Sequence, residues 1–326
     1  MKKNRGILLL FVFSLLALLI VLYFLLIPRL NEPGNSVSDT PAQSIVVTDC
    51  KTSEIIGFSY TAPSGQLLRF TYKDSTGMWL WAEDKDFPVN QTKAASAVEA
   101  MAAISASRVL EKGEISDADA GMEQPTATFS VTFTDGSERS FTIGAYNAFS
   151  QSYYLSDGSD SIYMIPSGLQ THFQSELLEL AAEAVIPTTA VTAEDISGYE
   201  VSDALSSHHY DDPALLEEFL YLYFYDVVDF KPDEAALAEY GLDSSATTIT
   251  AHYKVTKSLN GQDSAISSTS GVTASYDMVL RVGVLSEDND SQRYVMLDDS
   301  PLVYRMSAKT LNMLLAGAAP DADSAA

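Results

Sequence analysis

The chain of 326 residues carries 44 acidic and 19 basic side chains, which gives a formal net charge of −25 at pH 7. A surface this acidic repels nucleic-acid phosphates and anionic lipid headgroups, so both are disfavoured as partners. Cys50 is the single cysteine, which excludes an intramolecular disulfide, and a hydrophobic content of 46% supplies apolar material for two domains of ordinary size.

The first predicted element is a transmembrane helix over residues 7–28. The run Gly6–Ile27 contains no charged residue, and about 20 apolar residues are enough to cross the hydrocarbon core of a bilayer. Basic residues at 2, 3 and 5 precede it, so residues 1–6 are expected in the cytoplasm and the bulk of the chain on the extracytoplasmic side of the cell membrane. A cleavable signal peptide would need a shorter apolar core and a small-residue cleavage site, which the sequence after Ile27 lacks. The helix is therefore predicted to be an uncleaved, single-pass signal anchor.

An internal repeat organises the chain beyond this helix. Gly57 and Gly198, Gly144 and Gly283, and Tyr154 and Tyr294 each stand in similar local sequences at a nearly constant offset. We predict a linker over residues 29–43, a first α+β repeat over 44–187, a second over 188–317, and a disordered tail over 318–326.

Each repeat is expected to contain a β-hairpin. In the first, Phe129–Phe133 alternates apolar and polar residues, Asp135-Gly136 is typical of a tight turn, and Phe141–Ile143 resumes the alternation. In the second, the connection between the two strands is Lys257–Ser275, whose serine, threonine and glycine content is typical of a long mobile loop.

Helices are predicted to pack on these hairpins. Apolar spacing predicts one over Thr92–Leu110, and Asp212-Pro213 supplies an N-cap and a first-turn proline for another over Leu215–Val228. Shorter helices are expected over Leu169–Ala184 and Ser307–Ala316. The predicted fold class is α+β: an N-terminal transmembrane helix followed by two tandem repeats of an antiparallel β-hairpin sheet with packed helices.

Catalytic, cofactor and metal motifs are absent from the sequence. It has no P-loop, no G-x-S-x-G elbow and no paired histidines at metal-binding spacing. The acidic clusters Asp157–Asp160 and Glu287–Asp290 lack the ligand order of an EF-hand and fall between predicted strands, which favours hairpin turns over calcium sites. We expect no enzyme activity, no cofactor and no metal.

Aromatic residues are the best candidates for a ligand or partner surface. Two tryptophans two residues apart on one strand share a face, where they stack a sugar ring or fill a core. The tyrosine-rich stretch after Asp212 is core or, if part of it stays exposed, a protein-docking surface. The candidate residues are Trp79, Trp81, Tyr153, Tyr154, Tyr221 and Tyr225.

Several of these patterns resemble a bacterial family called domain of unknown function 4340. They are the strand ending in Trp79–Trp81, the segment Phe87–Val89 leading into a helix, the turn Tyr240–Asp243, and a strand ending in Ile143-Gly144 followed by Tyr153-Tyr154. The resemblance covers most of residues 44–184 and, more weakly, 188–317.

The resemblance implies an envelope protein whose relatives are often encoded beside ABC-type permease components. Our leading hypothesis is therefore a non-enzymatic, membrane-anchored accessory or scaffold protein that acts with another envelope protein, such as an ABC-type transporter permease. The alternative is a binding module for cell-wall glycan or peptide that uses the aromatic strands, and an unrecognised hydrolase is a third hypothesis.

Overall fold

The computed structural model describes residues 44–111, 113–182, 184, 192–258 and 271–317. The predicted transmembrane segment 7–28, the linker 29–43 and the tail 318–326 lie outside the described residues. In the part of the chain that the structure describes, no helix is long and apolar enough to cross a membrane. Residues Ile45–Ala326 form one compact unit.

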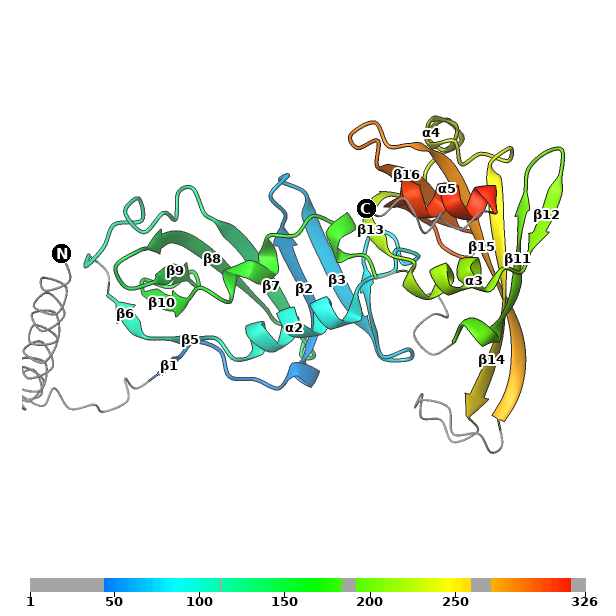
Figure 1. The fold of residues 1–326 in the computed structure, drawn as a ribbon. Coiled ribbons are helices and arrows are strands. Elements are labelled where there is room, and N and C mark those ends of the chain that lie inside the picture. The colour runs from blue at the N-terminus through cyan, green and yellow to red at the C-terminus, as the bar shows by residue number, and fades with distance from the viewer. Residues whose placement is uncertain (1–43, 112, 183, 185–191, 259–270, 318–326) are drawn as a thin grey trace, which may run out of the picture. The chain divides into compact units, whose positions relative to one another are not determined.

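The first half of this unit is built on an eight-stranded antiparallel sheet (Figure 1). Helix α2 (Gln91–Ala102) lies against one face of the sheet, and a two-stranded sheet of β1 (Ile45–Val46) and β5 (Ser105–Ala106) lies beside it. In spatial order the eight strands are β4 (Met78–Trp81), β3 (Leu67–Lys73), β2 (Ile55–Thr61), β7 (Ala127–Phe133), β8 (Glu138–Asn147), β9 (Ser152–Ser156), β10 (Ile162–Pro166) and β6 (Arg108–Leu110).

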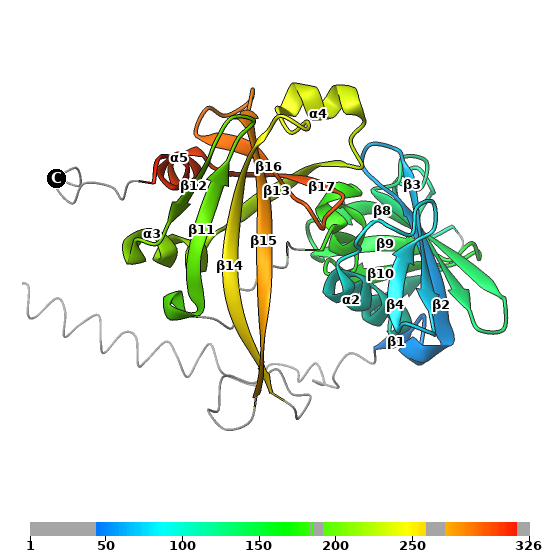
Figure 2. The ribbon, with the colours of Figure 1, turned by 90° about the vertical axis from the view of Figure 1, so that its right-hand side faces the viewer.

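The second half is built on a seven-stranded antiparallel sheet whose longest strands form one hairpin (Figure 2). The helices of this half are α3 (Pro213–Glu218), α4 (Glu234–Tyr240) and α5 (Ala308–Ala316). In spatial order the strands are β12 (Ser207–Tyr210), β11 (Ile196–Ser202), β14 (Thr247–Ser258), β15 (Gly271–Leu285), β16 (Gln292–Leu297), β17 (Leu302–Ser307) and β13 (Phe224–Phe230).

The predicted α+β class is wrong, because the described residues form mainly β-sheet. They contain seventeen strands and four α-helices, and the longest of these helices, α2, has 12 residues. The helix predicted over Thr92–Leu110 ends at Ala102 and gives way to β5 and β6. Among the described residues of the segment Leu169–Ala184, the helical structure is limited to the short 3-10 turns η2 (Gln170–Phe173) and η3 (Leu178–Leu180).

The largest single error is the helix predicted over Leu215–Val228. Helix α3 ends at Glu218, a 3-10 turn η6 (Phe219–Tyr221) follows, and the remainder is the edge strand β13. Aromatic and β-branched residues favour a pleated, half-buried surface, so this run pairs with β17 instead of continuing the helix. Helix α5, capped by the Ser307 side chain, confirms the prediction for Ser307–Ala316.

The predicted hairpin of the first sheet is confirmed. In the second sheet, the strands of the hairpin are longer than predicted. Strands β7 and β8 pair around a turn in which Gly136 has a φ of 82°. In the second sheet, strands β14 and β15 stay paired out to Ser258 and Gly271, so both ends of the predicted loop Lys257–Ser275 are strand. The rest of that predicted loop, residues 259–270, lies outside the described residues.

Contacts between Asp84–Phe87 and Phe230–Lys231 join the two halves of the unit. The rings of Phe87 and Phe230 meet edge to face, with centroids 5.1 Å apart. Lys231 Nζ donates to Asp84 Oδ2 at 2.7 Å and to Asp86 Oδ2 at 2.8 Å. The Lys231 ammonium holds the pKa of the Asp84 carboxyl below its usual range by hydrogen bonding.

This ion pair predicts a pH-dependent stability difference. Because the pKa of Asp84 is lower in the folded state, the pair stabilises the fold above the unfolded-state pKa of about 3.9 and loses that effect as pH falls through the folded-state value. We expect Lys231→Met to lower the melting temperature at neutral pH and to lower it less in acid, at a pH below the folded-state pKa of Asp84. Lys85→Met, which alters an exposed lysine between the two aspartates, is the control. An equal melting-temperature loss by Lys231→Met at both pH values would contradict the assignment.

Candidate functional site

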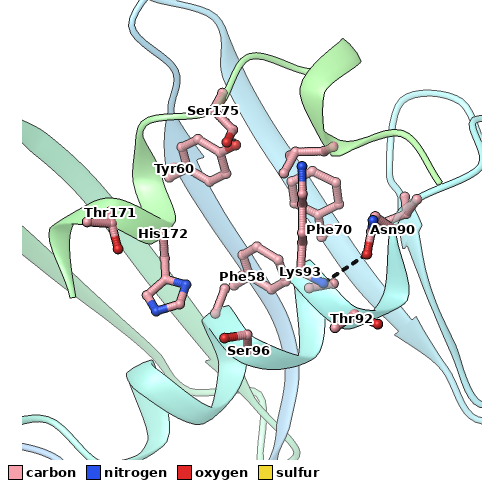
Figure 3. Close-up of a pocket in the computed structure, with 14 residues that line it drawn as sticks. Phe58, Tyr60, Phe70, Asn90, Thr92, Lys93, Ser96, Thr171, His172 and Ser175 are labelled. Atoms are coloured by element: carbon pink, nitrogen blue, oxygen red, sulfur yellow. Dashed lines mark hydrogen bonds between the residues drawn. The ribbon is translucent and has the colours of Figure 1, made fainter. Parts of the chain in front are cut away.

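A pocket with an aromatic floor lies between helix α2 and the segment 170–180 on one face of the first sheet (Figure 3). We call it the α2 pocket. Its cavity volume is about 370 Å³, near the lower end of the range for small-ligand sites. Its lining residues are Phe58, Tyr60, Phe70, Val89, Asn90, Thr92, Lys93, Ala94, Ser96, Ala97, Thr171, His172, Ser175 and Leu180.

Neighbouring strands supply the floor. Phe58 and Tyr60 lie two residues apart on β2 and therefore point to the same face, and Phe70 pairs with Phe58 from β3. The Phe58 and Phe70 rings stack with centroids 4.9 Å apart, and the Tyr60 and Phe70 rings stack at 6.4 Å. All three side chains are also part of the hydrophobic core, so the floor is fixed by packing.

Helix α2 forms one wall because its start is tied to β4 and to the segment before it. The Gln91 side chain accepts from the Trp79 N–H at 2.7 Å and donates to the Trp79 and Val89 carbonyls at 2.9 Å each. Asn90 caps the helix by accepting from the Lys93 N–H at 3.0 Å. Ala94 and Ala97 face the sheet, and their small side chains leave room above the aromatic floor.

The segment 170–180 forms the opposite wall and is held by hydrogen bonds from both sides. The Tyr60 hydroxyl donates to the Ser175 carbonyl at 2.8 Å, and Lys93 Nζ donates to the Glu179 carbonyl at 2.6 Å. Burial lowers the pKa of His172, so its imidazole is neutral at pH 7, and burial raises the pKa of the Tyr60 hydroxyl. The pocket therefore combines an apolar interior with one cation, Lys93, at its rim.

The two predicted tryptophan sites have mainly structural roles. Trp79 is 6% exposed and packs edge-on against Phe58 in the core, so its ring faces are covered. Trp81 is half-buried, and its ring packs edge to face against those of Phe87 and Phe230. Trp79 is therefore unavailable for stacking on a sugar, which removes one aromatic platform from the glycan-binding alternative.

Tyr153 and Tyr154 point to opposite faces of β9 and are both half-buried. The Tyr153 ring lies 5.0 Å from that of Tyr146, and the Tyr154 hydroxyl accepts from Asn147 Nδ2 at 2.7 Å. Asn147 Oδ1 also accepts from the Phe149 N–H, which fixes a turn whose Phe149 side chain is exposed. The two predicted tyrosines therefore do not form one surface.

Tyr221 and Tyr225 are exposed, and Tyr223 lies between them. Their exposed fractions are 71% for Tyr221, 65% for Tyr223 and 46% for Tyr225, and the Tyr223 and Tyr225 rings meet edge to face at 5.3 Å. We call these three side chains the tyrosine segment. Tyr223 belongs to the same tyrosine-rich stretch as the two predicted residues and completes it.

The acidic clusters are hairpin turns, as predicted. Asp157 follows β9 and accepts from the Ser159 N–H at 3.1 Å, while Asn289 lies between β15 and β16 and accepts from the Ser291 N–H. Over the described residues, no group of three or more histidine, cysteine, aspartate or glutamate side chains is arranged to hold a metal ion.

The α2 pocket was missed in the sequence because its residues come from four separate segments. One signal was present: Phe58, Tyr60 and Phe70 follow the alternation of two neighbouring strands and so mark one aromatic sheet face. No local pattern shows that Lys93 and His172 line the same pocket on that face.

Comparison with known proteins gives one match. A family model described as Domain of unknown function (DUF4340) matches residues 79–212, from Trp79 on β4 to the residue that caps α3. This match confirms the family resemblance drawn from the sequence motifs. No curated protein and no solved structure matches the chain.

Proposed function

We propose that this chain, which belongs over residues 79–212 to the DUF4340 family, is a non-enzymatic accessory or scaffold protein of the bacterial envelope. Residues 7–28 would anchor it in the cell membrane, and the unit Ile45–Ala326 would lie on the extracytoplasmic side. Its partner would be another envelope membrane protein, such as an ABC-type permease.

The tyrosine segment is the observation that carries this proposal. Tyrosine is enriched at protein interfaces because it offers a large contact area with one polar end and few rotatable bonds. Most other exposed large hydrophobic residues of the described chain stand singly, whereas here three tyrosines gather within five residues.

The backbone beneath the tyrosine segment is fixed, which favours a docking role. Phe219 and Leu222 are buried on the inner side, and the Phe224 ring packs against Tyr304 at 5.0 Å. Arg305 Nε donates to Asp226 Oδ1 at 3.0 Å next to Tyr225. A surface held in place before binding loses little conformational entropy when the partner docks.

Co-purification from gently solubilised membranes tests the proposal. Tagged full-length protein should enrich an identified envelope membrane protein over a control carrying only residues 1–43. The triple variant Tyr221→Ser, Tyr223→Ser, Tyr225→Ser should reduce that enrichment by about tenfold or more, because truncating one aromatic anchor typically costs about 2 kcal/mol of binding.

A second triple variant is the matched control for this experiment. Tyr72, Tyr146 and Tyr276 are exposed tyrosines elsewhere on the unit, and changing all three to serine should leave the enrichment intact. Recovery of the protein alone, or equal enrichment by both triple variants, would rule out docking through the tyrosine segment.

A further inference from the structure

We propose that the α2 pocket binds a single-chain amphiphile with an anionic head group, of the fatty-acid class. The apolar tail would lie on the floor of Phe58 and Phe70, and the carboxylate would pair with Lys93. This site is separate from the tyrosine segment and does not depend on the docking function.

The interior of the pocket favours an apolar ligand. Its buried lining residues are Phe58, Tyr60, Phe70, Val89 and the two alanines of α2, and half-buried Leu180 adds a further apolar side chain. The one polar atom at the floor, the Tyr60 hydroxyl, already donates to the Ser175 carbonyl. A polar group placed on the Phe58 and Phe70 rings would lose its hydration without gaining a hydrogen bond, whereas burial of an alkyl chain there is favourable.

The size of the pocket indicates one chain. A volume of about 370 Å³ lies near the lower limit of ligand pockets, which is about 300 Å³. A two-chain lipid would leave most of its apolar surface outside. Four rim residues, Thr92, Lys93, Ser96 and Thr171, are exposed to solvent, so a ligand can enter from that side (Figure 3).

The charge at the rim indicates a single negative head group. Lys93 is the one charged side chain among the lining residues, and none of them is a carboxylate, although the chain has a net charge of −25. Lys93 Nζ donates one of its three N–H groups to the Glu179 carbonyl. Its other two N–H groups can donate to a ligand. His172 adds no charge at pH 7 because burial lowers its pKa.

The acidic residues of the neighbouring segment are engaged elsewhere. The Glu176 carboxylate accepts from the Ser64 N–H and from the Ser64 hydroxyl, both at 2.7 Å. Glu179 Oε2 accepts from the Glu176 N–H at 2.9 Å. Within the described part of the chain, no carboxylate forms an ion pair with Lys93, so its charge is available to a ligand.

Photo-crosslinking of the full-length protein in its own membranes tests this site. The probe is a medium-chain fatty acid with a diazirine in its tail and an alkyne for detection. We expect labelled peptides from α2 and from strands β2 and β3. Ser96→Trp, which places an indole in the pocket mouth, should reduce this labelling by about tenfold, whereas Ala95→Trp should change it by less than about twofold. Ala95 is exposed on the same helix and does not line the pocket.

A second variant and a second probe test whether the pocket requires a negatively charged head group. Lys93→Glu should abolish labelling by the fatty acid but keep labelling by its methyl ester, a difference that loss of folding cannot produce. Labelling of the pocket peptides that is unchanged by Ser96→Trp would overturn the site. Equal labelling of the wild type by acid and ester would overturn the anionic ligand.

Discussion

Replacing Gly144 with alanine is expected to lower the free energy of unfolding by about 3 kcal/mol. A Cβ atom at Gly144 would collide with the carbonyl group of Ala120, which crosses directly over this strand. Ala120 is fully buried, and its carbonyl oxygen accepts from the Ala145 N–H at 2.8 Å. Neither the loop nor the strand can move away without breaking that hydrogen bond, so the added methyl group is not accommodated.

The control for Gly144→Ala is Gly168→Ala. Gly168 has open space around its Cβ position and does not have a positive φ, so alanine there should change stability by less than about 1 kcal/mol. Urea unfolding followed by circular dichroism measures both. A Cβ atom at Gly283 would collide with the Tyr240 carbonyl oxygen in the same way. Gly283→Ala should therefore lose about as much stability as Gly144→Ala. A Gly144→Ala protein as stable as Gly168→Ala would show that the loop over β8 is not packed as described.

Replacing Trp79 with alanine is expected to cost about 3–5 kcal/mol of stability, the range for a buried large aromatic side chain. Trp79 is 6% exposed, contacts Phe58 and Tyr72, and lies beside the Gln91 side chain that fixes the start of α2. Its loss opens a cavity between β4 and the helix. The same urea-unfolding measurement tests this expectation.

Met78→Ala is the matched control for the tryptophan. Met78 precedes Trp79 on the same strand, points to the other face and is 43% exposed, so its truncation should cost less than about 1 kcal/mol. If Trp79→Ala were as stable as Met78→Ala, the indole would not be a core residue. Its ring would then be available to stack on a sugar.

The sequence predicted features that depend on near neighbours along the chain. The alternation around Phe129 and Phe141, with Asp135-Gly136 between them, specified a hairpin because side-chain direction in a strand has a period of two. Ser307 specified the start of α5 because an N-cap acts within one helical turn. The family motif at Trp79–Trp81 falls at the first residues of the DUF4340 match.

Helix lengths were predicted less well, because an apolar and aromatic run is compatible with either a helix or a strand. Phe224–Phe230 forms β13 because it pairs with the edge of β17. The residues of β17 lie about 70 to 80 positions further along the chain, so no local pattern shows this pairing. The same competition shortened the helix that begins at Gln91, whose predicted continuation pairs with β1 and β10.

The sequence by itself determined the acidic charge, the lack of known catalytic motifs, the resemblance to the DUF4340 family over residues 79–212 and the main hairpins, since each depends on composition or on residues close together in the chain. Tertiary structure decided which aromatic residues are accessible. It buried Trp79, exposed Tyr221 and Tyr223, and brought Lys93, His172 and Phe58 together in the lining of one pocket. Exposure and cavity shape depend on which distant segments pack together, and that choice follows from burying the apolar surface of the whole chain rather than from any local pattern.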